Sequence, residues 1–263
     1  MPYSRKIISG YAALATALAF APFFFALAET ADTAPKDGLQ SELSRLTDSL
    51  DLLSAMKANK RPADATALQT ALNDVLRLSE EEVRGLATRI ASQDGLTEKE
   101  DVERRAIASD LADLKLHMKS VRTDTTQEAG PTAVAAIAQK FKEWRDGPYA
   151  DVMQRATAFA SVFENDDSIK AANTRLAAIL KDERKIRSLL PASKTSAFLR
   201  LIKKAQGELH KAAELNAEAK ELLDPTTPAP DDGTSAASLA ADASDLVNAA
   251  YDDFIAMSKL IRK

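Results

Sequence analysis

The 263-residue chain carries 39 acidic and 35 basic side chains, a formal net charge of −4, and no cysteine. The missing thiol excludes a disulfide scaffold, a zinc–thiolate site, a thiol nucleophile and a lipid-modified N-terminal cysteine. The slight acidic excess argues against a nucleic-acid partner, because phosphate-backbone binding requires a clustered basic face.

The first 28 residues have the pattern of a secretory signal peptide. Arg5 and Lys6 precede an apolar run over residues 7–28, which ends in Ala-Leu-Ala, the small-x-small pattern that signal peptidase accepts. Cleavage would change the formal net charge from −4 to −6. An uncleaved anchor is the alternative, since ~20 apolar residues suffice to span a bilayer. We expect a periplasmic or secreted protein of the bacterial envelope, or otherwise an inner-membrane-anchored protein facing the periplasm.

After a polar leader over residues 29–38, apolar residues recur every three and four positions, the period of an amphipathic helix. Glycine and proline fall mostly between these stretches and so mark helix ends. A proline-rich linker over residues 224–234 precedes the last helix. The predicted helices span residues 39–59, 62–93, 97–129, 131–164, 165–190, 193–223 and 235–261, and the fourth of them is expected in two pieces, 131–146 and 148–164.

Capping signals define several of these ends. Thr97 and Glu100 form a Thr-x-x-Glu capping box at a helix start. A similar pattern from Ser79 to Glu82 would allow a break or kink within the helix over 62–93. Gly95 is predicted to terminate that helix.

Two further signals divide the stretch that follows Pro131. Gly147-Pro148 is a stop signal, because proline lacks a backbone N–H and disrupts a helix interior. Residues 165–167 (Asn-Asp-Asp) are typical of a helix N-cap. We therefore expect separate helices before Gly147, after it, and after Asn165.

The sequence predicts an all-α fold, since no stretch alternates with the period of a β-strand. The 4-3 spacing of apolar residues favours nearly antiparallel, coiled-coil-like packing. We expect an elongated up-and-down bundle of about six to seven long helices, with the bundle over residues 39–223. The C-terminal helix, residues 235–263, is expected to dock in cis, with binding to a partner as the alternative.

The most distinctive segment contains Phe141, Trp144 and Tyr149 within nine residues around Gly147-Pro148. The favoured interpretation is a helix-to-helix corner packed by aromatic rings. The alternative is a ligand-facing kink, because a broken helix exposes backbone groups, and Trp and Tyr add polar tips. This segment is the best candidate ligand or partner surface in the sequence.

Asn216 occupies a core position of the most regular heptad seam, between Ala212 and Ala219. A buried Asn in such a seam fixes helix register or partner choice. Its partner could lie within this chain or on a second copy, so a homo-oligomer stays open. A rotation of the helix that places Asn216 at the seam edge is also open.

No motif for catalysis, metal binding or cofactor binding is present, and we expect none of these sites. His117 follows Asp113 by one turn and His210 precedes Glu214 by one turn, but neither has the Glu-x-x-His pattern of a di-iron bundle. Exposed histidines in charge-rich helices are the simpler interpretation.

The leading functional hypothesis is a non-enzymatic envelope protein that acts as a scaffold or interaction module for an unidentified protein partner. A helical sensor that binds a small ligand or lipid near Trp144 and Tyr149 is the second hypothesis. An unrecognised enzyme or metal protein is the third. A membrane contact is expected only if residues 7–28 remain as an anchor.

Overall fold

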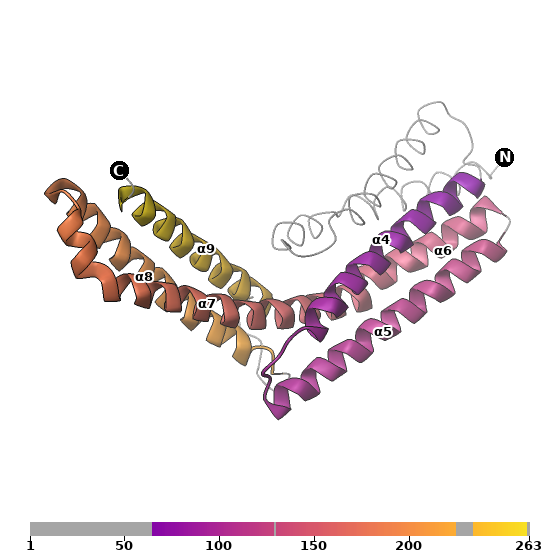
Figure 1. Ribbon diagram of the computed structural model, residues 1–263. Helices are drawn as coiled ribbons and strands as arrows, with labels where there is room; N and C mark the ends of the chain where they lie inside the picture. The colour runs from indigo at the N-terminus through magenta and orange to yellow at the C-terminus, as the bar shows by residue number, and fades with distance from the viewer. Residues whose placement is uncertain (1–64, 129, 225–233, 262–263) are drawn as a thin grey trace. The chain divides into compact units, whose positions relative to one another are not determined.

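The computed structural model describes residues 65–128, 130–224 and 234–261, and all regular structure in these ranges is helical (Figure 1). This confirms the all-α prediction. The predictions for the signal peptide, the polar leader, the helix over 39–59 and most of the linker lie outside the described residues. The helices are α4 (Ala65–Ala91), α5 (Glu98–Gln127), α6 (Pro131–Trp144), η1 (Arg145–Tyr149), α7 (Ala150–Leu189), α8 (Ala192–Glu221) and α9 (Ala236–Ile261).

The described chain divides into two compact units. The first unit contains α4, α5, α6, η1 and the first residues of α7, up to Met153. The second contains the rest of α7 from Gln154, together with α8 and α9. The short segment 93–96 groups with the second unit.

Helix α4 runs without a break through Ser79 and Glu82, so the kink considered there is absent. Ser79 is buried, and the apolar stripe continues through Val83 and Leu86 on the same side. Burial on both sides of the local capping pattern keeps this turn helical. The helix ends at Ala91, two residues before the predicted end, so the prediction that Gly95 terminates it is wrong. Gly95 lies in the following connection with the left-handed φ of 71° that glycine accommodates best.

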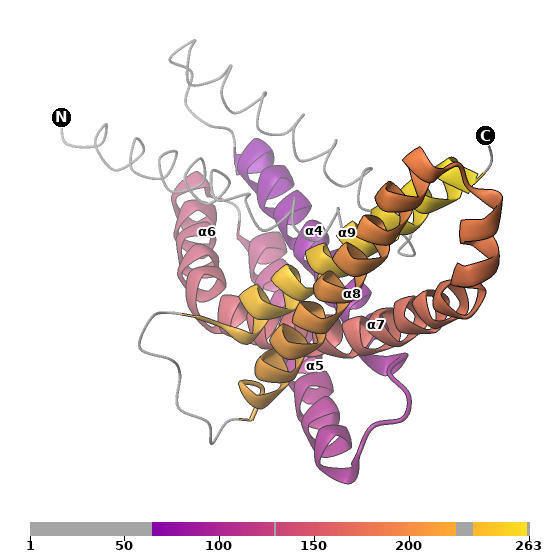
Figure 2. The ribbon, with the colours of Figure 1, turned by 90° about the vertical axis from the view of Figure 1, so that its left-hand side faces the viewer.

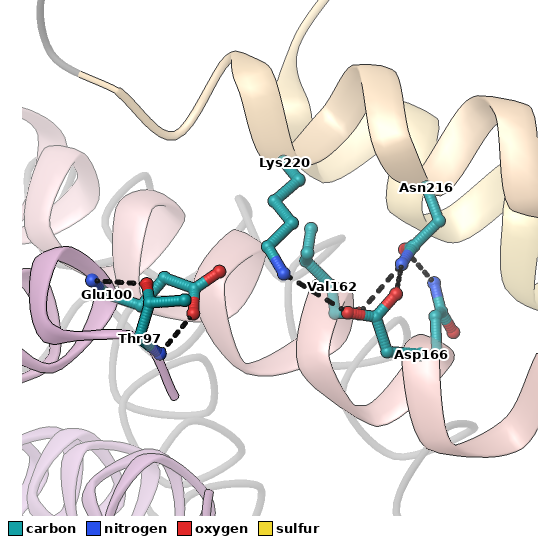
Figure 3. Close-up of polar contacts among 7 residues, drawn as sticks. Thr97, Glu100, Val162, Asp166, Asn216 and Lys220 are labelled. Atoms are coloured by element: carbon teal, nitrogen blue, oxygen red, sulfur yellow. Dashed lines mark hydrogen bonds and ion pairs between the residues drawn. The ribbon is translucent and has the colours of Figure 1, made fainter. Parts of the chain in front are cut away.

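Helix α5 begins at the predicted capping box, which is confirmed (Figure 3). The Thr97 backbone N–H donates to Glu100 Oε2 at 2.7 Å, and the Glu100 N–H donates to Thr97 Oγ1 at 3.4 Å. These bonds satisfy two N–H groups that the helix itself leaves without partners. The predicted apolar stripe is also buried, and consists of Ile107, Leu111, Leu114, Met118 and Val121.

Helices α4, α5 and α6 contact one another within the first unit. The Gln69 side chain of α4 donates from Nε2 to the carbonyls of Thr125, at 3.0 Å, and Glu128, at 2.6 Å. Both carbonyls lie at the C-terminal end of α5, where the carbonyl groups of the last turn have no N–H donor within the helix. Gln69 therefore ties the two helices together through groups that the helix end leaves open.

The predicted stop at Gly147-Pro148 is wrong. Helix α6 passes into the π-helical turn η1 and then into α7 without an intervening loop. A π-helix pairs residues five apart and adds one residue to the turn, which gives room for a ring that an α-helical turn would not accept. Pro148 lies inside this turn, and the Ala150 N–H just after it bonds to the Gly147 carbonyl.

The predicted cap at residues 165–167 is wrong as well, because α7 continues unbroken from Ala150 to Leu189. Asn165 is buried, and both Asn165 and Asp166 bond to Asn216 of α8. These side chains are engaged in tertiary contacts and leave the local backbone in its helical hydrogen bonding. The predicted end before Pro191 is confirmed, since α7 ends at Leu189.

The second unit is built on the seam predicted for α8, and α8 and α9 run side by side (Figure 1 and Figure 2). Phe198, Ile202 and Leu209 of α8 are buried in a core shared with α7 and α9. The docking of α9 in cis is therefore confirmed. The α7 and α9 members of this core are Ile169, Ala172, Leu176, Val247, Ala250, Phe254 and Met257.

The apolar pattern of the last helix predicts a buried stripe of Leu239, Leu246, Phe254, Met257 and Ile261, and α9 is rotated slightly from that face. Ala243, Val247 and Ala250 are buried, whereas the predicted stripe residue Leu246 is only half-buried and Ile261 is exposed. Small residues on the buried side let α9 approach its neighbours closely. Ile255 and Ile261 are left exposed on α9, where they line the groove described below.

Candidate functional site

The aromatic segment predicted from the sequence forms a compact group in the first unit. The Trp144 ring lies 5.5 Å from that of Phe141 and 5.3 Å from that of Tyr149, measured between centroids. His117 of α5 stacks on the Trp144 ring, and the two ring centroids lie 4.2 Å apart. We call these four residues the aromatic corner. Phe141 and Tyr149 are buried, Trp144 is half-buried and His117 is exposed, so the corner reaches the surface at the Trp144–His117 stack.

Tyr149 carries the corner into the unit interior. Its hydroxyl donates to Glu82 Oε2 of α4 at 2.7 Å and lies 3.4 Å from the Ser79 carbonyl oxygen. Arg145 Nη2, from the same π-helical turn, lies 3.8 Å from that Glu82 oxygen. The turn thus presents a phenol and a guanidinium together to one carboxyl group on the neighbouring helix.

Burial dominates the electrostatics of this contact. It raises the pKa of Glu82 above its usual value, although the Arg145 charge and the Tyr149 hydrogen bond act in the opposite direction. Burial, reinforced by the Glu82 charge, also raises the pKa of Tyr149 well above its usual value. The Ser79 hydroxyl oxygen is buried without a hydrogen-bond partner among the described residues. Ionisation of the Glu82 carboxyl group therefore has a desolvation cost, which the Tyr149 hydroxyl and the Arg145 guanidinium offset in part.

The sequence analysis missed Glu82, although the chain contains a signal for it. Leu72, Val75, Ser79, Glu82 and Leu86 follow one another at spacings of three and four, so Glu82 occupies a stripe position of α4. The sequence instead indicates a local capping pattern at residues 79–82, in which Glu82 would satisfy backbone N–H groups of its own helix. A carboxyl group at a stripe position is a reason to search for a buried donor.

His117 is the exposed face of the corner. Partial burial against Trp144 lowers the pKa of its imidazole, while the nearby Asp124 carboxylate raises it. The ring is therefore held toward its neutral form, which stacks on the indole without a desolvated charge. Such a stack is worth about 0.5–1.5 kcal/mol beyond the area it buries.

Asn216, the fourth predicted site residue, lies in the second unit and is almost completely buried, with 1% of its surface exposed. Its amide nitrogen donates to the Val162 carbonyl at 2.9 Å and to Asp166 Oδ1 at 2.7 Å (Figure 3). Its Oδ1 accepts from Asn165 Nδ2 at 3.2 Å, and that nitrogen also donates to the Ala240 carbonyl of α9 at 2.7 Å. Asn216 thus lies inside the seam, and its hydrogen-bonding partners belong to this chain.

This amide network joins three helices at one level of the unit. Asn165 belongs to α7, Asn216 to α8 and the Ala240 carbonyl to α9. Lys220 Nζ of α8 lies 3.4 Å from Asp166 Oδ2 and 4.6 Å from the centre of the Phe163 ring, both on α7. A shift of one helix along another would separate the amide donors from their acceptors, so the network fixes the register of the helices.

The remaining histidine makes a surface contact. His210 Nε2 lies 3.2 Å from Glu214 Oε1, one turn along α8, and both side chains are largely exposed. Within the described ranges, no three His, Asp or Glu side chains gather closely enough to hold a metal ion.

Comparison with known proteins gives no relative: no protein-family model, no curated protein sequence and no solved structure matches this chain. The functional argument therefore depends on the geometry of the described residues.

Glu82→Gln tests the electrostatics of the corner. Because the folded-state pKa of Glu82 is raised, the folded unit holds this proton more tightly than the unfolded chain does. The resulting stabilisation is present below the unfolded pKa of ~4.3 and is lost as the pH rises through the folded value. The uncharged amide has no such loss. The free energy of unfolding of the Gln variant should therefore increase relative to wild type as the pH rises from about 4 to 8.

Urea unfolding followed by fluorescence measures this difference, because Trp144 is the only tryptophan in the chain and lies beside the contact. Glu143→Gln, on the exposed face of α6, is the matched control and should keep the wild-type pH dependence. Parallel pH profiles for wild type and Glu82→Gln would contradict the assignment.

Proposed function

We propose that this chain is a non-enzymatic protein of the bacterial envelope, periplasmic or secreted, whose helical units serve as a scaffold or interaction module. The observation that carries this proposal is an apolar groove in the second unit. The finer architecture predicted from the sequence, an up-and-down bundle of about six to seven long helices, is part of the same proposal. The mutual packing of amphipathic helices within each unit supports it.

The groove has a volume of about 440 Å³ and opens along α7 and α9. Its walls combine core residues with two isoleucines at the surface: Ile255 is 51% exposed and Ile261 is 42% exposed. Exposed isoleucines that border a concave apolar surface are typical of a contact area for another molecule. The lining residues are Arg175, Ile179, Ile186, Phe198, Phe254, Ile255, Met257, Ser258 and Ile261.

The occupant that fits this groove is an amphipathic helix of a partner protein. Arg175 and Ile186 lie eleven residues apart on α7, which corresponds to ~16 Å, or about three turns of helix. An apolar stripe of i, i+3, i+4 and i+7 residues fills a groove of this kind. The Arg175 guanidinium at one end, which also lies over the Tyr251 ring at 5.6 Å, favours an acidic residue on the partner.

The C-terminal helix is not the segment that this protein lends to a partner. Helix α9 packs against α8, and Phe254 and Met257 are buried in the core of its own unit. Removing α9 from that core would expose these side chains to water. The chain is therefore proposed to offer a groove, whereas the partner supplies the helix.

Export is proposed from the basic and apolar pattern of residues 1–28. No helix in residues 65–128, 130–224 or 234–261 is both long enough and apolar enough to cross a bilayer. The chain should be expressed with its own N-terminus in a bacterial host, then fractionated and weighed by mass spectrometry. We expect an envelope species that begins at Glu29. A full-length species in the membrane fraction would replace cleavage with anchoring, and a cytoplasmic one would contradict export.

The groove is tested by site-specific photocrosslinking. A photoreactive residue in place of Ser258, which lines the groove, should give a discrete adduct in envelope extracts. The adducted peptide is expected to be an acidic amphipathic helix. Ile255→Asp should abolish the adduct, because it places a charge in the apolar contact, while Leu116→Asp, at a 65% exposed leucine of the first unit, should leave it intact.

Circular dichroism must show that both aspartate variants remain folded. An adduct that survives Ile255→Asp, or none at all, would remove the support for a helix-binding groove. A crosslink between two copies of this chain would instead identify the groove as a homo-oligomer interface.

The second candidate function is the binding of a small ligand at the aromatic corner. The observation that favours it is the π-helical turn, a feature frequent at functional sites, directly beside the exposed Trp144–His117 stack. A ligand that inserts at this stack must change the environment of the indole. The proposal of a lipid or metabolite ligand follows from the mixed aromatic and polar character of the corner.

A screen of metabolites and lipids, read by Trp144 fluorescence and by thermal shift, tests this second function. We expect a saturable change with wild type that is lost in His117→Ala, since this substitution removes one face of the stack. His210→Ala, at an exposed histidine of the second unit, is the matched control. A flat response across ligand classes would eliminate the candidate.

A further inference from the structure

A second groove, of about 770 Å³, lies between α4 and α5 in the first unit. Unlike the groove in the second unit, its lining is dominated by charged and polar side chains. Four of the lining side chains are cationic and two are acidic. They are Glu80, Glu81, Arg84, Lys115, Lys119, Arg122, Thr123, Thr126 and Gln127.

Both acidic side chains of this groove are engaged with its arginines. Arg122 Nη2 lies 2.9 Å from Glu80 Oε2, and Arg84 pairs with Glu81 one turn away on α4. The ammonium groups of Lys115 and Lys119, in contrast, make no ion pair or hydrogen bond with any described residue. The groove therefore has two positive charges that its own acids do not balance.

The two lysines repel each other. Lys115 and Lys119 are four residues apart on α5, and like charges at this spacing destabilise a helix. No acidic residue lies three or four positions before or after either lysine to relieve the repulsion, and Arg122 extends the same stripe. Lysines at the same spacing in α7, Lys181 and Lys185, differ in having Asp182 close by.

The hydroxyl groups of the groove are already committed to the helix. Thr123 Oγ1 donates to the Lys119 carbonyl at 3.0 Å, and Thr126 Oγ1 donates to the Arg122 carbonyl at 2.8 Å. The donors left for an incoming ligand are therefore mainly the two ammonium groups. Ammonium groups bind phosphate as compact point charges, and their rotatable N–H donors do not require the planar acceptor that a guanidinium prefers.

We propose that this groove binds a ligand through its phosphate groups, with Lys115 and Lys119 as the main donors. Its volume lies within the ~300–1,000 Å³ that small-molecule sites occupy. Two lysines one helical turn apart fit two adjacent phosphate groups, or one phosphodiester with its neighbouring oxygens. The site lies in the first unit and does not depend on the helix-binding function proposed for the second.

Calorimetric titration of the full chain with inorganic pyrophosphate at low salt tests the site. Wild type should bind one pyrophosphate, and added salt should weaken the binding because the contact is between exposed charges. Lys115→Gln and Lys119→Gln should each weaken it by about tenfold or more, since each removes a charge-assisted hydrogen bond. Lys181→Gln combined with Lys185→Gln is the matched control, with the same spacing and charge change on α7, and should bind as wild type does.

A second titration distinguishes the source of the phosphate. Binding to pyrophosphate alone identifies a free phosphorylated molecule. Additional binding to vesicles that contain phosphatidylglycerol, but not to vesicles of phosphatidylcholine alone, identifies an anionic lipid head group, and either result supports the site. Absence of binding to both probes would overturn the proposal. Binding that survives the combined Lys115→Gln and Lys119→Gln substitutions, with Trp144 fluorescence showing an intact fold, would overturn it too.

Discussion

Pro148 has no backbone N–H to donate, and its ring would collide with a carbonyl of the preceding turn in a regular α-helix. The chain absorbs both effects in the π-helical turn Arg145–Tyr149, which keeps α6 and α7 continuous. The same turn directs Tyr149 and Arg145 to the carboxyl group of Glu82 on α4. Backbone accommodation of one proline therefore determines where the aromatic rings, the buried carboxyl group and the Trp144 surface lie.

Periodic apolar patterns and side-chain caps could be predicted because both act within a few residues of sequence. The α5 stripe, the α8 seam and the Thr97 capping box are of this kind. The two errors after Pro131 have different causes, since a π-helical turn of the backbone accommodates Gly147-Pro148, whereas tertiary contacts engage the side chains of Asn165 and Asp166. Asn165 would cap a helix if its side chain were free, but it bonds to Asn216 and to the Ala240 carbonyl. Periodicity alone does not reveal such distant partners.

The two units use buried polar groups in different ways. Around Asn216, two amide side chains bond to each other, to main-chain carbonyls and to the exposed Asp166 carboxylate, so the network crosses three helices without burying a charged group. Around Glu82, a carboxyl group is buried beside the Tyr149 hydroxyl and the Arg145 guanidinium, and its pKa is raised because desolvation outweighs both contacts. A satisfied amide network contributes specificity, whereas a desolvated carboxyl group leaves stability sensitive to pH. Asn216 was correctly predicted as a seam residue, whereas Glu82 was assigned to a local capping pattern.

Surface features outside these cores carry the functional argument. A polar group that is already hydrogen-bonded inside the fold gains little by binding a ligand. The Asn216 network is therefore assigned a structural role. The opposite holds for Ile255 and Ile261, whose apolar area is still in contact with water, and for Lys115 and Lys119, whose mutual repulsion an anion would relieve. The binding proposed at the first pair would be driven by the hydrophobic effect and that proposed at the second by Coulomb attraction, so salt should affect the two proposed sites in opposite directions. The two grooves are therefore physically distinct and separable by experiment.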